Sequence, residues 1–229
     1  MWTALKDFVL PLCGNCESAS ASYFCQPCRD RLAFKNVCPL CGQEGLAHCQ
    51  STCLSCQNET TPWDKLKISF VYRDGVIQWI RKIKDQSRPE LWRVVSKEDV
   101  MEFQDRIDAV LPLPSDPLKR RKRGYGSSEL LARRIAKLLN SDFIELFDRK
   151  PSFKSQRDRS LYERYAELRS EISLKPHQKI PPGKLLLVDD VMTTGASLWI
   201  CAEILQAKAV ELEAFVVARV PKAKPCHFS

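Results

Sequence analysis

The sequence predicts an α/β protein with a mainly parallel sheet, flanking helices and a small cysteine-rich module at its N-terminus. Nine of the eleven cysteines fall between Cys13 and Cys56. Beyond that segment, short apolar runs alternate with amphipathic stretches, which is the pattern of a parallel sheet covered on both faces. We therefore predict a cysteine-rich module at 1–62 and an α/β domain at 63–229.

The individual elements of the α/β domain follow from the spacing of apolar residues. Apolar runs predict strands at 66–72, 107–111, 143–147, 185–188 and 214–217. Amphipathic stretches predict helices capped by Asp74, at 127–139 and at 197–205. Ligands bind beyond the carboxyl ends of the strands in such sheets, and the motifs described below fall at those ends.

The overall composition is that of a soluble globular protein, with 44% hydrophobic and 28% charged residues in 229. No apolar run approaches the ~20 residues that span a bilayer, so we expect no membrane insertion. The first residues, MWTALKDFVLPLC, do not contain the apolar stretch of a secretory signal. The sequence therefore predicts a cytoplasmic protein.

Four CxxC motifs follow one another in the N-terminal module. Their cysteines are Cys13, Cys16, Cys25, Cys28, Cys38, Cys41, Cys53 and Cys56. Two CxxC turns supply four thiolates to one tetrahedral zinc ion, so eight thiolates predict two structural zinc sites, as in a zinc ribbon. A redox-active CxxC is the alternative, but four motifs in so short a segment favour zinc. The spacing leaves open whether the motifs pair sequentially or crosswise, and His48 and Cys49 could each replace a ligand.

The positive charge lies in the body rather than in the module. Residues 1–62 hold four Lys/Arg and five Asp/Glu, a net of −1, so the +8 of the whole chain leaves +9 for residues 63–229. Zinc bound by thiolates would make the module still more negative. A basic body predicts a polyanionic partner, a phosphate-bearing substrate, or both.

The segment LLLVDDVMTTGAS, residues 185–197, carries the most specific motif. A buried strand leads into Asp189 and Asp190, and a helix then opens at Thr193, Thr194, Gly195, Ala196 and Ser197. Small residues at a helix N-terminus let backbone N–H groups surround a phosphate. The two carboxylates suit a sugar diol or the water shell of Mg²⁺. The order of these features fits a 5-phosphorylated ribose better than an ordinary strand–loop–helix with a capping threonine.

This segment resembles the PRPP loop of type I phosphoribosyltransferases, and with the CxxC motifs the chain resembles the ComF family. Further matches run over most of the chain: Tyr72, Gly75, Lys84, Pro112-Leu113-Pro114, Arg121, Arg123, Gly124, Gln156, Glu163, Arg164 and Arg219. The sequence departs from the family where RGFNQ reads RGYGS, at 123–127, and where Glu167 replaces an asparagine. PRPP binding is therefore better supported than transfer to an acceptor.

The resemblance implies a phosphoribosyltransferase-type sheet, Mg²⁺ bound with PRPP, and a role in DNA uptake during natural transformation. It places Lys84, Arg121, Arg123 and Arg164 near the pyrophosphate, and it leaves the catalytic residues unidentified. It also implies a helicase-type competence protein as a partner.

The basic body predicts binding of single-stranded DNA. The candidate contacts are Lys119, Arg120, Arg121, Lys122, Arg123, Arg157 and Arg159. A solvated surface or a general polyanion patch is the alternative for the run 119–123, and a nuclear localisation signal is less consistent with its place after a strand and a proline loop. We favour a PRPP-binding DNA-uptake protein. An active Mg²⁺-dependent phosphoribosyltransferase with an unknown acceptor, and a PRPP-sensing interaction module, are the alternatives.

Overall fold

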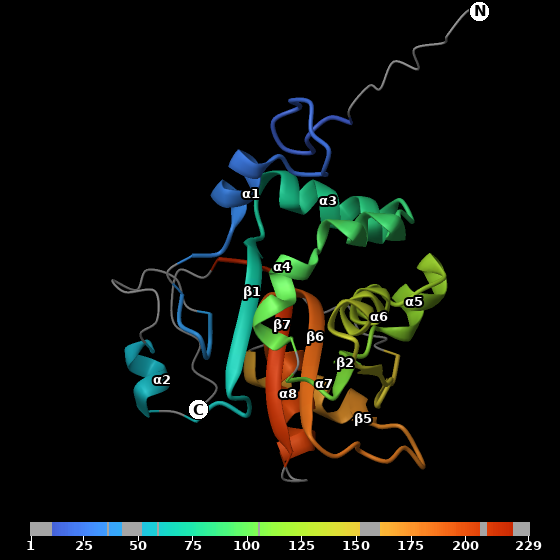
Figure 1. Cartoon of the computed structure of the whole chain (residues 1–229). Coiled ribbons are helices and arrows are strands. Elements are labelled where there is room, and N and C mark those ends of the chain that lie inside the picture. Colours follow the sequence, from blue (N-terminus) through green and yellow to red (C-terminus); the bar gives the residue numbers. More distant parts are fainter. Residues whose placement is uncertain are drawn as a thin grey trace, which may run out of the picture.

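The architecture of the chain is a five-stranded parallel sheet with helices on both faces (Figure 1). The computed structural model describes residues 11–35, 37–42, 52–58, 60–104, 106–151, 161–206 and 210–221. The strands, in spatial order, are β1 (Lys65–Val71), β7 (Glu211–Arg219), β6 (Lys184–Met192), β2 (Ala109–Pro112) and β3 (Asp142–Phe143). The predicted α/β fold class is confirmed.

The central strand β6 shows how the sheet separates two hydrophobic clusters. Leu186 and Val188 point into one cluster, while Leu185 and Leu187 point into the other. The hydrophobic cluster that holds Leu186 and Val188 is covered by α3 (Asp74–Asp85), η1 (Pro89–Val94), α4 (Lys97–Val100), η2 (Met101–Phe103) and α6 (Ser127–Leu139). The other is covered by α7 (Leu161–Glu171), α8 (Ala196–Gln206) and the hairpin of β4 (Phe147–Arg149) with β5 (Ile172–Leu174). Burial on both faces explains why β6 reads as a continuous apolar run.

Several predicted boundaries are corrected by the structure. The single strand expected at 143–147 is two separate strands, because β3 pairs with β2 whereas β4 turns away to pair with β5. Asp74 is the first residue of α3 rather than its cap, and Arg73 precedes the helix. Helix α6 has the predicted bounds and ends at Leu139, and the next residue, Asn140, has a φ of 55°, the left-handed conformation common after a helix.

The described part of the cysteine-rich segment lies along the edge strand β1. Its helices α1 (Gln26–Leu32) and α2 (Leu54–Asn58) are on the β1 side of the sheet, whereas α5 (Pro117–Arg123) is on the β2 side (Figure 1). Backbone hydrogen bonds join the segment to β1, from Phe34 N to Ser69 O at 3.0 Å and from Leu66 N to Pro39 O at 2.7 Å. The segment therefore shares the core of the sheet, and the domain boundary at residue 62 stays a prediction.

None of the helices in the described ranges has the length and apolar character needed to cross a bilayer.

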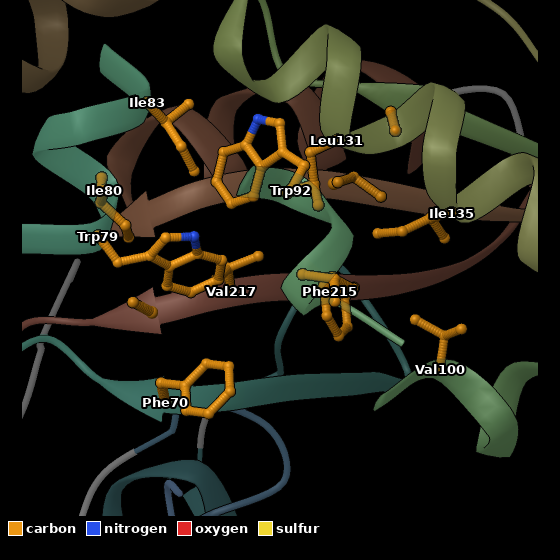
Figure 2. Close-up of a cluster of buried hydrophobic side chains, with 14 of the residues drawn as sticks. Phe70, Trp79, Ile80, Ile83, Trp92, Val100, Leu131, Ile135, Phe215 and Val217 are labelled. Carbon is orange, nitrogen blue, oxygen red and sulfur yellow. The ribbon is translucent and has the colours of Figure 1, made fainter. Parts of the chain in front are cut away.

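Trp79 of α3 lies where the cysteine-rich segment, the sheet and η1 meet. Its ring is fully buried and makes edge contacts with Phe24, Phe70 and Trp92, with centroids 5.5–5.8 Å apart. Figure 2 shows Trp79 between Phe70 and Trp92. The indole Nε1 donates to Leu91 O at 3.0 Å, which satisfies the one polar atom of the side chain. One residue thus joins three parts of the fold.

Trp79→Ala is expected to lower the free energy of unfolding by about 3–5 kcal/mol, because it removes the buried ring and leaves a cavity among other aromatic rings. Urea unfolding followed by circular dichroism measures the loss. Leu118→Ala, at an exposed position of α5, is the matched control and should change stability by less than about 0.5 kcal/mol. A loss below about 1 kcal/mol for Trp79→Ala would contradict the central position of this ring.

Candidate functional site

The acid pair lies within the central strand and not after it. We predicted a strand ending at Val188, but β6 continues to Met192, because Asp189, Val191 and Met192 remain paired with β7. The strand therefore delivers the pair to the carboxyl end of the sheet, as expected for a ligand site in this fold. A short turn then leads into α8, which begins at Ala196.

Asp190 is buried and forms an ion pair with Lys84. The Lys84 Nζ lies 2.7 Å from Asp190 Oδ1, and only 6% of Asp190 is exposed. Lys84 comes from the last turn of α3, far from β6 in the sequence. A buried carboxylate needs a partner of opposite charge, and Lys84 supplies it. Of the predicted pyrophosphate cations, the structure brings this one to the acid pair itself.

Asp189 is half-buried and accepts hydrogen bonds from neutral donors. Ser128 Oγ donates to Asp189 Oδ1 at 2.8 Å, and the backbone N–H of Asp190 donates to the same oxygen at 2.9 Å. Ser128 lies in the first turn of α6 and was not predicted as a site residue. A serine just after a Gly-containing turn at a helix start was the signal in the sequence.

Burial and the neighbouring Asp190 carboxylate raise the pKa of Asp189 to about 7, and Lys84 and Ser128 offset only part of this rise. The two adjacent carboxyl groups are therefore chemically different. Asp190 is held against a cation, whereas Asp189 gains or loses its proton near neutral pH. Such a pair can accept hydrogen bonds from two neighbouring hydroxyls, and the protonated Asp189 can also donate one.

The turn after β6 could hold a phosphate group. Gly195 has a φ of 85°, and a Cβ on this residue would lie 2.5 Å from the Met192 Cε. Thr194 Oγ1 accepts from Ala196 N at 3.3 Å, which helps to close the turn at the start of α8. Thr193 is exposed and Ser197 is half-buried, so hydroxyls flank the helix N-terminus. The residues fit a phosphate group, which such N-termini bind through backbone N–H groups.

The eight CxxC cysteines form two separate clusters. We call Cys13, Cys16, Cys25 and Cys28 the first cluster, and Cys38, Cys41, Cys53 and Cys56 the second cluster. In each cluster the sulfur atoms all lie within 4.8 Å of one another, and all eight cysteines are free of disulfides. The motifs therefore pair sequentially, which the spacing alone left open.

The sulfur separations fit a tetrahedral ion. The Sγ atoms of Cys16 and Cys25 are 3.6 Å apart, as are those of Cys41 and Cys53. Four sulfurs at the Zn–S distance of about 2.3 Å would lie about 3.8 Å from one another. Backbone N–H groups of Cys25 and Cys53 also point at cluster sulfurs, at 3.3 and 3.4 Å. Each cluster could hold a zinc ion. His48 and Cys49 lie outside the described residues.

The basic run forms a short helix, α5, that follows the proline loop. Asp116 caps it by accepting from Leu118 N, and Gly124, with a φ of 86°, ends it. Lys119, Arg120, Arg121 and Lys122 are exposed, and Arg123 is half-buried.

The basic candidates differ in the contacts that they make. Arg120 is ion-paired with Glu129 at 2.8 Å and with Glu145 at 3.4 Å. Arg164 lies in α7 at a position whose side chain is not described, and Arg157 and Arg159 lie outside the described residues. Arg121 and Arg123 remain candidates for the pyrophosphate by prediction only.

Tyr125 connects the end of α5 to the acid pair. Its hydroxyl donates to the carbonyl of Ile83, the residue just before Lys84. The aromatic residue of the RGYG segment therefore joins the loop after α5 to the last turn of α3. This contact could not be predicted from the sequence, because it joins residues far apart in the chain.

Asp189→Asn should change the pH dependence of stability. A carboxyl group whose pKa is raised on folding favours the folded state below its ordinary pKa, and this contribution is lost as the pH rises from about 4 to about 7. Asparagine does not titrate. Between pH 5 and pH 8 the free energy of unfolding of the variant should therefore rise by at least about 1 kcal/mol relative to that of wild type. Urea unfolding at both pH values, with Asp142→Asn as the exposed control, measures it. A stability difference that is independent of pH would contradict the raised pKa.

Comparisons with known proteins find relatives over most of the chain, although no family model matches it. The chain is 25% identical to competence protein F of Haemophilus influenzae over 197 residues, which is 82% of this chain and 86% of that protein. It is 24% identical to competence protein ComFC of Bacillus subtilis over 209 residues, 85% and 83% of the two chains. It is 27% identical to the DNA utilization protein YhgH of Escherichia coli over 180 residues, 75% and 78% of the two chains.

Among solved structures, an adenine phosphoribosyltransferase from Trypanosoma brucei matches 62% of this chain and 70% of its own, with a TM-score of 0.38 and 17% identity. The corresponding enzyme from Saccharomyces cerevisiae matches 65% and 70%, with a TM-score of 0.34 and 17% identity. The sequence relatives, the α/β sheet and the two four-cysteine clusters agree with one another. Over most of its length the chain is therefore similar to two competence proteins and to a DNA utilization protein.

Proposed function

We propose that this protein binds PRPP with Mg²⁺ and acts in DNA uptake during natural transformation, with single-stranded DNA held by its basic body. The names of its relatives, competence protein F and DNA utilization protein, support the role in DNA uptake. The acid pair and the turn beside it support PRPP as the ligand. We also propose a cytoplasmic location and two domains, a zinc-ribbon module at 1–62 and a phosphoribosyltransferase-like domain at 63–229.

The arrangement of Asp189, Asp190 and Gly195 carries the proposal of PRPP. The ribose hydroxyls would bind the two carboxyl groups, and the 5-phosphate would lie at the N-terminus of α8, against residues 193–197. The φ of 85° is the left-handed conformation that favours glycine, and it occurs at the point where the backbone would meet the phosphate. Mg²⁺ would arrive with the pyrophosphate and neutralise part of its charge.

Lys84 would have a second use when the ligand is bound. Its Nζ is 2.7 Å from Asp190 Oδ1. A sugar hydroxyl that hydrogen-bonds to Asp190 would leave the Lys84 ammonium, which has three donors, able to contact a phosphate oxygen as well. Arg121, Arg123 and Arg164 are the further cations that we propose for the pyrophosphate. The altered RGYGS segment leaves transfer to an acceptor as the second hypothesis.

The exposed cations of α5 support the DNA-binding part of the proposal. Lys119, Arg121 and Lys122 are exposed on a helix that follows the carboxyl end of β2, on the same end of the sheet as the acid pair. Helix α2 of the negatively charged N-terminal segment lies on the other edge of the sheet (Figure 1). DNA held by α5 would therefore lie near the PRPP site and away from the second cluster.

PRPP with Mg²⁺ should bind the wild-type protein, and Asp189→Ala/Asp190→Ala should weaken binding by at least about tenfold, or 1.4 kcal/mol, because both sugar-binding acceptors are lost. Isothermal titration calorimetry measures this directly. Asp142→Ala, an exposed carboxylate on β3, should bind as wild type does. Absence of binding by the wild type, or equal binding by the double variant, would refute the proposal. Release of pyrophosphate in an acceptor screen would instead favour the active-enzyme alternative.

Neutralising α5 should weaken binding of single-stranded DNA and reduce its dependence on salt. Lys119→Gln/Arg121→Gln/Lys122→Gln removes three exposed cations and leaves the ion-paired Arg120 in place. Each lost phosphate contact should reduce the slope of log K against log salt by about 0.7. The control Lys97→Gln/Lys137→Gln/Lys179→Gln makes the same charge change at exposed positions elsewhere. Equal slopes for both triple variants would place the DNA contacts outside α5. Fluorescence anisotropy with a labelled oligonucleotide measures the slopes.

A further inference from the structure

Arg219 is a buried cation at the end of the strand that neighbours the acid pair. It is the last residue of β7, it is 1% exposed, and it pairs with Val71 of β1 on one side and Met192 of β6 on the other. A guanidinium is seldom buried without a specific task, because its removal from water costs several kcal/mol. Its guanidinium contacts both the second cluster and Met192, which precedes the turn after the acid pair.

One contact leads to the second cluster. Arg219 Nη1 donates to the carbonyl of Cys41, a member of that cluster. The next residue, Gly42, has a φ of 66°, and a Cβ there would lie 2.8 Å from the same Nη1. The backbone that carries the cluster is therefore packed directly against the guanidinium. A zinc ion with four thiolates carries a net charge of about −2, which the buried cation would balance.

The other contact leads to the turn after the acid pair. Arg219 Nη1 lies 3.7 Å from the sulfur of Met192. The Met192 methyl group in turn lies so close to Gly195 that it would meet a Cβ there at 2.5 Å. A short series of contacts therefore runs from Cys41 through Arg219 and Met192 to Gly195, joining a cysteine cluster to the proposed phosphate cradle.

We propose that Arg219 is a positioning residue that couples metal binding at the second cluster to the conformation of the 193–197 turn. Metal at the cluster fixes the Cys41 carbonyl, the carbonyl orients the guanidinium, and the guanidinium holds Met192 beneath Gly195. The part of this proposal that concerns PRPP rests on the proposed function. Coupling between two sites is reciprocal, so bound PRPP must also stabilise the metal at the second cluster.

The test measures zinc release and ligand affinity on the same full-length, zinc-loaded protein. Zinc transfer to a chromophoric chelator gives the release rate of each ion, and calorimetry with PRPP and Mg²⁺ gives the affinity. The variants are Arg219→Met, which removes the charge, and Arg219→Lys, which keeps the charge without the planar fork. Arg134→Met is the matched control, because Arg134 also donates to backbone carbonyls, of Val95 at 2.7 Å and Arg93 at 3.1 Å, and neither residue belongs to a cysteine cluster.

Arg219→Met should release one of the two zinc ions at least about tenfold faster than wild type and bind PRPP about tenfold more weakly. Arg219→Lys should fall between the two in zinc release. PRPP should slow zinc release from the wild type and from Arg134→Met, and should lose this effect in both Arg219 variants. Met192→Ala, which breaks the contacts at the other end, should also abolish it, so the proposal can be judged even when Arg219→Met does not fold.

The results separate this inference from the proposed function. If the wild type does not bind PRPP, the proposed function is refuted. The zinc-release rates then still decide whether Arg219 stabilises metal binding at the second cluster. A wild type that binds PRPP without any change in zinc release overturns the coupling. Wild-type zinc release from folded Arg219→Met overturns the role of Arg219 at the cluster.

Discussion

Asp189 and Asp190 place two carboxyl groups side by side at the end of the central strand, and the folded chain has to compensate both. Lys84 pairs with one of them and Ser128 hydrogen-bonds to the other. These partners come from α3 and α6, on the face of the sheet where the first hydrophobic cluster lies. The packing of both helices is therefore tied to the two carboxyl groups of the acid pair.

Helix α3 is fixed at both ends by different parts of the chain. At its start, the Asn15 side chain accepts from Gly75 N at 3.0 Å and also contacts Cys28 of the first cluster, with its Nδ2 3.2 Å from the sulfur. In its middle, Trp79 packs among aromatic rings from three segments. Its last turn holds Lys84 against Asp190. The first cluster thus contributes to the placement of a residue in the candidate site, although it lies beyond the opposite end of the helix.

The segment that carries the two cysteine clusters packs against the sheet. Their segment contributes Phe24 and Leu32 to one hydrophobic cluster and Phe34 to the other. A short segment with few apolar residues gains stability from burial against a larger sheet, and the proposed zinc ions would stabilise it further. In this arrangement the first cluster contacts α3 and the second contacts Arg219 beside β6. The two cysteine clusters, the hydrophobic core and the candidate site are therefore linked through direct contacts.

The sequence by itself determined the features that depend on local patterns. The apolar run at 185–188 predicted a central strand, the amphipathic pattern gave α6 its bounds, and CxxC spacing predicted two four-cysteine sites. It could not determine which motifs share a site, that 143–147 divides between two sheets, or that Ser128, Tyr125 and Arg219 contact the acid pair and its surroundings. Those features were decided only by the tertiary structure, because each depends on side chains that are far apart in the sequence and meet only when the helices pack on the sheet.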